Sequence, residues 1–148
     1  IPVREFNKKF TALINIDPDI IERKIKKFNA HDSDNTEILK LFRMILRYGI
    51  KNNISDIHIN AYKDFCWLRY RQNGKIQAKY ILNTELAQRF SMIIKEKSNA
   101  DLIDVKTPKS IGFTENFEMG IVDFRVEIAP SHFGENIVIR ILDKSNNL

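Results

Sequence analysis

Four arginines on expected β-strands are the side chains whose type and spacing suit chemistry best. Arg69 and Arg71 lie two residues apart in one apolar run, Arg125 lies in a second alternating run, and Arg140 lies in a third. A guanidinium group keeps its charge and offers a planar fork of N–H donors, a geometry that suits phosphate. Several arginines on one face of a sheet could stabilise charge on a phosphoryl group that another domain binds. We therefore treat these four residues as candidate nucleotide contacts.

Each arginine also has a simpler interpretation. Exposed sheet residues of opposite charge often pair across strands, and Asp123, Glu127 and Glu135 are suitable acidic neighbours. For a single arginine, a structural ion pair of this kind is the more common arrangement. A cluster of several on one face would favour the phosphate interpretation.

The other motifs do not complete a catalytic site. None of the five glycines begins a G-x-x-x-x-G-K-[ST] loop, so no P-loop is expected. Ser131-His132 lacks the context of an oxyanion hole, which argues against a catalytic triad. Cys66 alternates with Leu68 and Tyr70 and is expected to be a small buried residue rather than a nucleophile. We expect no enzyme activity from this chain alone.

A metal site is not expected either. The three histidines are far apart, and with one cysteine they give no zinc-ligand spacing. His58 with Asp56 could form part of a metal site, but polar residues on a sheet face that bond to neighbouring strands are the simpler interpretation.

Composition and charge set broad limits. The chain has 148 residues, 43% of them hydrophobic, and a net charge of +5. The positive charge permits contact with nucleic acid, although most of the excess lysines belong to expected helix surfaces and no recognition helix is apparent. A single cysteine suits a reducing cytosol, and no run approaches the roughly 20 apolar residues that cross a bilayer. Because the chain opens at Ile1, we expect it to be part of a longer protein.

Two helices are expected before the first strand. Asp17 followed by Pro18 is a helix-start signal, and an apolar stripe at four- and three-residue spacing follows. The polar stretch 30–33 is expected to be a linker. Asp34 with Glu37 forms a capping box that begins the second helix, which should end near Gly49 or one turn later.

The remainder reads mainly as strands. We expect strands near residues 56–60, 65–71, 76–82, 110–118, 121–130 and 135–142, from their alternating apolar residues. Asn73-Gly74 predicts a tight hairpin turn, and Asn83 or Thr84 should cap a third helix. This order predicts an α+β fold, a largely antiparallel sheet of about six strands with helices on one side and an N-terminal helical extension.

Residues 36–144 resemble a known family, the second N-terminal domain of the secretion-superfamily ATPases. These are the hexameric cytoplasmic motors of type IV pilus assembly and type II protein secretion. The resemblance rests on ordered motifs: Ser55-Asp56-Ile57-His58-Ile59, Leu68-Arg69-Tyr70-Arg71-Gln72-Asn73-Gly74, Val122-Asp123-Phe124-Arg125-Val126, Ala129-Pro130-Ser131-His132-Phe133-Gly134-Glu135 and Ile139-Arg140-Ile141-Leu142-Asp143-Lys144.

The resemblance implies a domain organisation. Residues 34–144 would form a PAS-like domain, preceded by a helical extension and linker at 1–33. Residues 145–148 would begin a linker to a RecA-like ATPase domain that holds the Walker motifs. The extension could pack on the domain, reach a neighbouring subunit, or belong to a more N-terminal domain, and the sequence leaves these alternatives open.

The resemblance also implies a role for the arginines. ATP and Mg would bind in the full-length protein only, between the two domains, and arginines of the PAS-like domain would reach the phosphates. Arg125 matches one such arginine, whereas Arg69, Arg71 and Arg140 match family positions of less certain role. The implied partners are the protein's own ATPase domain, neighbouring subunits of a homo-hexamer, and an inner-membrane platform protein. The protein would be cytoplasmic and associated with the inner membrane through these partners, with no nucleic acid expected.

One motif departs from the family pattern. The family usually has Pro-Gln-Asp-Gly-Arg after the third helix, and that arginine is another phosphate contact. Here the stretch is Pro108-Lys109-Ser110-Ile111-Gly112-Phe113, and the arginine is absent. Lys109 could substitute in part, although a point charge does not replace a fork of donors.

We therefore expect a regulatory and inter-subunit domain of a secretion or pilus motor that contributes arginines to bound ATP. Two other classes stay open. One is a basic nucleic-acid-binding module, which only the net charge supports. The other is a PAS-like sensor of a small ligand, which a pocket lined by Phe65, Trp67 and Tyr80 would favour.

Overall fold

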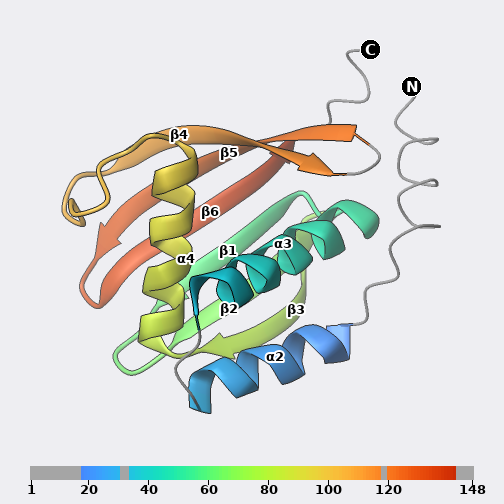
Figure 1. The fold of residues 1–148 in the computed structure, drawn as a ribbon, viewed down its shortest axis with the longest axis horizontal. Helices are drawn as coiled ribbons and strands as arrows, with labels where there is room; N and C mark the ends of the chain where they lie inside the picture. Colours follow the sequence, from blue (N-terminus) through green and yellow to red (C-terminus); the bar gives the residue numbers. More distant parts are fainter. Residues whose placement is uncertain (1–17, 31–33, 118–119, 143–148) are drawn as a thin grey trace.

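A mixed structure with one antiparallel sheet is seen in the computed structural model, which describes residues 18–30, 34–117 and 120–142 (Figure 1). In order, the elements are α2 (Pro18–Ala30), α3 (Asn35–Lys51), β1 (Asp56–Ala61), β2 (Cys66–Gln72), β3 (Lys75–Leu82), α4 (Thr84–Lys97), β4 (Lys109–Phe117), β5 (Gly120–Ser131) and β6 (Gly134–Leu142). The strands of these described residues form one sheet in the order β3-β2-β1-β6-β5-β4, and every neighbouring pair is antiparallel. The α+β prediction is therefore confirmed. Asp17, residues 31–33 of the linker expected at 30–33, and the segment 145–148 lie outside the described residues, whereas Ala30 is the last residue of α2.

Local sequence signals determine where these elements begin and turn. The Asp34 carboxylate accepts a hydrogen bond from the Glu37 backbone N–H at 2.9 Å, as an N-cap does at a helix start. Asn83 caps α4 in the same way, accepting from the Leu86 N–H at 2.7 Å. Asn73 and Gly74 both have positive φ, 51° and 79°, as a two-residue hairpin turn requires. The predicted caps and the predicted hairpin are confirmed.

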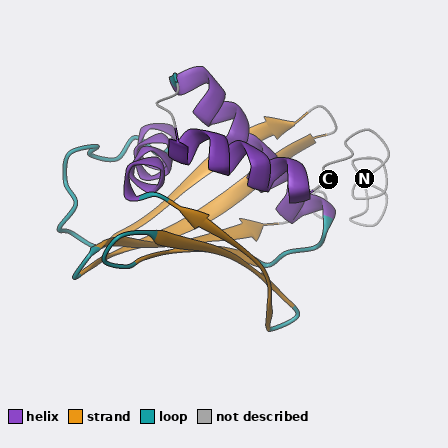
Figure 2. Cartoon of the chain, turned by 90° about the horizontal axis from the view of Figure 1, so that it is seen from below, coloured by secondary structure: helices purple, strands orange, loops and turns teal. Residues whose placement is uncertain are grey.

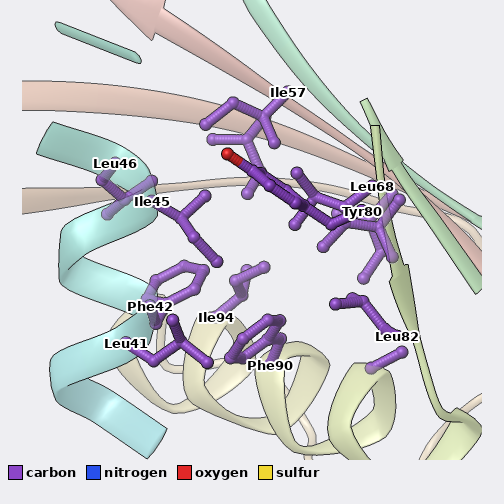
Figure 3. Close-up of a cluster of buried hydrophobic side chains, with 14 of the residues drawn as sticks. Leu41, Phe42, Ile45, Leu46, Ile57, Leu68, Tyr80, Leu82, Phe90 and Ile94 are labelled. Carbon is purple, nitrogen blue, oxygen red and sulfur yellow. The ribbon is translucent and has the colours of Figure 1, made fainter. Parts of the chain in front are cut away.

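The helices cover one face of the sheet and leave the other without a described helix (Figure 2). Alternation along the strands explains this layering, because the residues of one face are apolar and buried. Figure 3 shows how the core closes: Phe42 of α3 and Phe90 of α4 meet above the sheet, with ring centroids 5.5 Å apart. Ile57, Leu68 and Leu82 approach them from three strands.

Helix α2 belongs to the same core. Its apolar stripe, Ile21, Ile25 and Phe28, is buried in one cluster with α3 and the sheet. Asn29 at its end donates to the Ile81 carbonyl at 3.1 Å and accepts from the Asn83 N–H at 2.9 Å. Residues 18–30 thus pack on the sheet domain, which is one of the placements that the sequence left open.

A buried ion pair joins α4 to the β5–β6 hairpin on the helix side. Lys95 Nζ lies 2.8 Å from Glu135 Oε2, and the Lys95 side chain is only 1% exposed. Ser91 donates to the other carboxylate oxygen at 2.7 Å, and Lys95 also donates to the Asp104 carbonyl at 3.2 Å. Both charges are therefore hydrogen-bonded, as burial demands.

None of the helices in the described part of the chain has the length and apolar character of a membrane-spanning helix.

Candidate functional site: the arginine face

Figure 2 shows one face of the sheet that no described helix covers, and the burial patterns of β2, β5 and β6 place the four candidate arginines on it. In β2, Arg69 and Arg71 alternate with buried core residues. In β5, Arg125 lies between buried Phe124 and Val126, and Arg140 of β6 follows buried Ile139. Because successive side chains of a strand point to opposite faces, all four arginines point away from the core. The arginines thus share one face, the arrangement that would favour the phosphate interpretation, and we call this surface the arginine face.

Strand register sets three of these arginines in one line across the sheet. Arg71 is the partner of Asp56, Asp56 is the partner of Arg140, Arg140 is the partner of Arg125, and Arg125 is the partner of Gly112. We call these five residues the arginine row. Side chains of direct partners have Cβ atoms roughly 4.5–5.5 Å apart. Four neighbouring strands therefore place three guanidinium groups and one carboxylate side by side, and Gly112 of a fifth strand ends the row.

Asp56 and Arg140 form the ion pair of this row. Arg140 Nε donates to Asp56 Oδ1 at 3.1 Å, and Ser55 Oγ donates to Asp56 Oδ2 at the same distance. The Asp56 side chain is 12% exposed, whereas that of Arg140 is 65% exposed. The carboxylate is thus anchored in the sheet, while most of the guanidinium faces solvent.

Arg125 has a like charge rather than an acid as its direct neighbour. Its partner on β6 is Arg140, and no described side chain pairs with its guanidinium. The acids of the same strand are engaged elsewhere: Asp123 accepts from Thr114 at 2.8 Å, and Glu127 accepts from Ser110 at 2.8 Å. Like charges directly opposite each other destabilise a sheet. Packing alone therefore does not account for this pair.

The four arginines differ in whether a described side chain holds their guanidinium group. Arg69 Nη2 donates to Asn60 Oδ1 at 2.6 Å, which holds the side chain within the sheet. Arg71 is exposed, and no described carboxylate lies within ion-pair distance of it. Arg125 and Arg71 are thus open, Arg140 is held at one nitrogen, and Arg69 is held at its tip.

The acidic partners expected from sequence were wrong. Asp123 and Glu127 bond to strand neighbours, and Glu135 pairs with Lys95 on the opposite side of the sheet. Asp56 is the acid that pairs with a candidate arginine, and sequence reasoning missed it in this role. The signal was visible only as an acidic residue on an outward position of β1. Its partner lies 84 residues away in β6, so the pairing depends on strand order.

His58 lies in the neighbouring line, opposite Arg69. Burial lowers the pKa of its imidazole, and the nearby positive charges of Arg71 and Arg69 lower it further, although Asp56 opposes them. The neutral form of His58 is therefore favoured at neutral pH, so this imidazole adds no positive charge to the arginine face. Within the described ranges, no three His, Cys, Asp or Glu side chains converge as a metal site would need.

A hollow of about 300 Å³ lies beside Arg125, lined by residues of β4, β5 and the end of β6. Gly112, the partner of Arg125, forms part of it. A Cβ atom at this position would lie 3.2 Å from the Phe124 carbonyl oxygen, so any side chain here would require the backbone to shift. Residues Ser110, Ile111, Gly112 and Phe113, which belong to the stretch that departs from the family pattern, thus line the hollow next to Arg125.

Lys109 does not fill this space. Its ammonium pairs with Asp104 at 3.1 Å, and its side chain is 11% exposed. In register it lies opposite Ile128, three residues along β4 from Gly112. The suggestion that Lys109 substitutes for the absent arginine is therefore not supported by its position.

The pocket that would favour a ligand sensor is not formed by the expected residues. Phe65 and Trp67 meet edge to face on the outward side, with centroids 5.6 Å apart. Tyr80 points the other way into the core, where it meets Tyr70. These aromatic side chains therefore do not line one cavity. Cys66 is buried, and burial raises the pKa of its thiol, which agrees with a structural role.

Comparisons with known proteins agree on one family. Residues 31–148 match the family described as "Type II/IV secretion system protein". The chain is 30% identical over 113 residues to the type II secretion system protein E of Pectobacterium carotovorum, covering 76% of this chain and 23% of that protein. It is 30% identical over 118 residues to the type IV pilus assembly ATPase PilB of Myxococcus xanthus, covering 79% and 21%. It is 29% identical over 112 residues to the type II secretion system ATPase E of Vibrio cholerae, covering 76% and 22%.

The chain therefore spans less than a quarter of the length of these relatives. The family match includes every strand of the arginine row. The resemblance inferred from the ordered motifs is confirmed: this chain belongs to the type II/IV secretion system protein family.

Proposed function

We propose that this chain is the part of a type II secretion or type IV pilus assembly ATPase that contributes arginines to bound ATP. Two of the three relatives named above are called ATPases, and the full-length protein would bind ATP and Mg in a RecA-like domain outside this chain. One observation supports the proposal most directly. Arg125 and Arg140 are direct cross-strand partners on an open face, and Arg125 has no described acidic partner.

The electrostatics of the row suit a ligand with several negative charges. Two adjacent guanidinium groups repel each other, and a phosphate chain placed between them would replace that repulsion by charge-assisted hydrogen bonds. Arginine forks aimed at a transferring phosphoryl group stabilise charge that develops in the transition state. In this role Arg125 acts on the phosphates, Arg140 supports it, and Arg71 extends the positive charge along the row.

This interaction would also draw the two domains together. With phosphates bound, the arginine face and the ATPase domain would be held close, and after phosphate release the repulsion between Arg125 and Arg140 would favour opening. In a homo-hexamer, such closure would turn each domain against its neighbours and act on the inner-membrane platform protein. The chain would thus be a regulatory, PAS-like and inter-subunit domain of a cytoplasmic motor.

The distribution of charge favours a compact anion over a nucleic acid. Arg125 alternates along its strand with Asp123 and Glu127, which lie on the same face. A long polyanion would meet these carboxylates as well as the arginines. A nucleic-acid partner would instead need a continuous basic stripe.

The test uses the full-length ATPase that contains this chain. Arg125→Ala should lower kcat for ATP hydrolysis on the order of 100-fold, because one preorganised donor to the phosphates is lost. Arg125→Lys should fall between wild type and Arg125→Ala, since it keeps the charge but loses the fork. Arg23→Ala is the matched control, because Arg23 is an exposed arginine of α2 on the other side of the sheet. Wild-type turnover by a folded Arg125→Ala variant would remove Arg125 from the mechanism.

A further inference from the structure

We infer that Asp56 is a positioning residue, which holds Arg140 by its Nε so that the two terminal nitrogens are available to phosphate beside Arg125. This inference rests on the proposed function and assigns the one acidic member of the arginine row. It also assigns Arg140, whose role the sequence left uncertain.

The geometry of the ion pair supports the inference that Asp56 orients Arg140. The contact between the two residues uses Nε and one carboxylate oxygen, at 3.1 Å. A guanidinium group has five N–H donors in a fixed plane, so holding Nε also fixes the direction of both terminal nitrogens. No described residue accepts a hydrogen bond from those terminal nitrogens, and the side chain is 65% exposed. The contact with Asp56 therefore orients Arg140 and leaves its two terminal nitrogens available to a ligand.

The surroundings of Asp56 support the inference that its carboxylate is itself held in a fixed position. Its other oxygen accepts a hydrogen bond from Ser55 Oγ, and that hydroxyl also lies 3.1 Å from the Arg71 carbonyl oxygen. The single hydroxyl hydrogen is shared between these two acceptors, but the Ser55 backbone N–H also donates to the Arg71 carbonyl at 2.9 Å and so holds Ser55 against β2. The Asp56 side chain beside it is mostly buried. A buried anchor of this kind keeps the long Arg140 side chain from losing orientation when no phosphate is bound.

The place of Asp56 in the arginine row supports the inference that phosphate binds beside Arg140 and Arg125. Asp56 is the direct partner of both Arg71 and Arg140, so it separates these two positive charges. The pair that lacks a carboxylate is Arg140 and Arg125. The phosphate position is thereby directed to the β5–β6 side of the row, next to the hollow at Gly112.

Two alternative roles of Asp56 predict opposite effects when its negative charge is removed. If Asp56 acted only through its negative charge, removing that charge would strengthen binding of anionic nucleotide. If it positions Arg140, removing the charge would release Arg140 and lower the rate, because misplaced donors lose transition-state stabilisation.

The experiment measures ATP hydrolysis by the full-length protein with Asp56→Asn, which keeps the size of the side chain. We expect kcat to fall roughly tenfold or more, with a smaller change in KM for Mg-ATP. The double variant Asp56→Asn with Arg140→Ala should differ less than about twofold from Arg140→Ala alone, since Asp56 acts through Arg140. A purely structural role of Asp56 would instead lower activity by the same factor in both backgrounds.

Thermal unfolding of each variant accompanies the kinetics. If Asp56→Asn does not fold, Ser55→Ala and Arg140→Lys decide the matter. Ser55→Ala removes one bond to the carboxylate, and Arg140→Lys keeps the charge without a fork, so both should lower kcat. Unchanged or higher kcat/KM in a folded Asp56→Asn variant, or wild-type kcat in both of these substitutes, would overturn the inference. If Arg125→Ala loses activity and Asp56→Asn keeps wild-type activity, this inference alone is overturned. If Arg125→Ala and Arg140→Ala both keep wild-type activity, the proposed function is overturned.

Discussion

Two ion pairs on opposite sides of the same sheet differ in how far they are closed. On the helix side, Lys95 and Glu135 are 1% and 11% exposed, and Ser91 and the Asp104 carbonyl complete their hydrogen bonds. On the arginine face, Asp56 is 12% exposed, but its partner Arg140 is 65% exposed. The first pair satisfies both charges internally, and the second satisfies only the acid.

This difference separates structure from function within one fold. A closed pair joins α4 to the β5–β6 hairpin and offers nothing to a ligand. An open pair leaves donors of fixed direction at the surface, next to Arg125, whose guanidinium has no acidic partner among the described residues. Changes on the helix side should therefore act mainly on stability, and changes on the arginine face mainly on catalysis.

The largest effect on stability is expected at the closed pair. Glu135→Gln leaves the Lys95 ammonium buried without its counter-charge, which should lower the free energy of unfolding of the 148-residue chain by about 3 kcal/mol. Urea unfolding measures the change. The matched control is Glu22→Gln in the exposed pair of Lys26 and Glu22, whose side chains are 72% and 50% exposed. That control should change stability by less than about 0.5 kcal/mol. Equal losses in both variants would remove the distinction between closed and exposed pairs.

A smaller effect is expected from acid at His58, on the arginine face. The folded chain lowers the pKa of this imidazole, chiefly through burial and then through Arg71 and Arg69. The unfolded chain therefore takes up the proton first as the pH falls below about 6.5, and the folded state loses relative stability. Between about pH 7.5 and pH 5.5 the wild type should lose more stability than His58→Gln, on the order of 0.5 kcal/mol after allowance for solvent screening.

Urea unfolding at the two pH values measures this difference. Added salt should reduce it, because the contributions of Arg71 and Arg69 are then screened. A steeper acid loss in His58→Gln than in the wild type would contradict the assigned direction.

The smallest effect on stability is expected at Arg125 itself. Arg125→Ala removes a charge that faces Arg140, so at low salt the free energy of unfolding should stay constant or rise by a few tenths of a kcal/mol. Thermal unfolding at low and high salt measures the change, which should shrink as salt is added. A clear loss of stability would show that Arg125 has a structural partner and would weaken the contrast between the two faces. The same variant should nevertheless lower ATP hydrolysis by the full-length protein.

Much of the fold could be predicted because its signals are local. The caps Asp34 and Asn83 and the turn Asn73-Gly74 act within three residues of chain, and each is confirmed. Alternation with a period of two also placed Arg125 and Arg69 on the outward face. The distance to a partner on another strand has no such local signal, so the ion-pair partners proposed from sequence were wrong.

The sequence by itself thus determined the element types, the outward direction of the arginines and the family motifs. Only the tertiary structure decided that β6 lies between β1 and β5, which brings Arg140 between Asp56 and Arg125. The physical reason is that side-chain direction follows from the geometry of each strand, whereas lateral order follows from packing the whole sheet against its helices. The arginine row depends on that packing, since the pairing of β1 with β6 joins two strands whose members Asp56 and Arg140 are 84 residues apart along the chain.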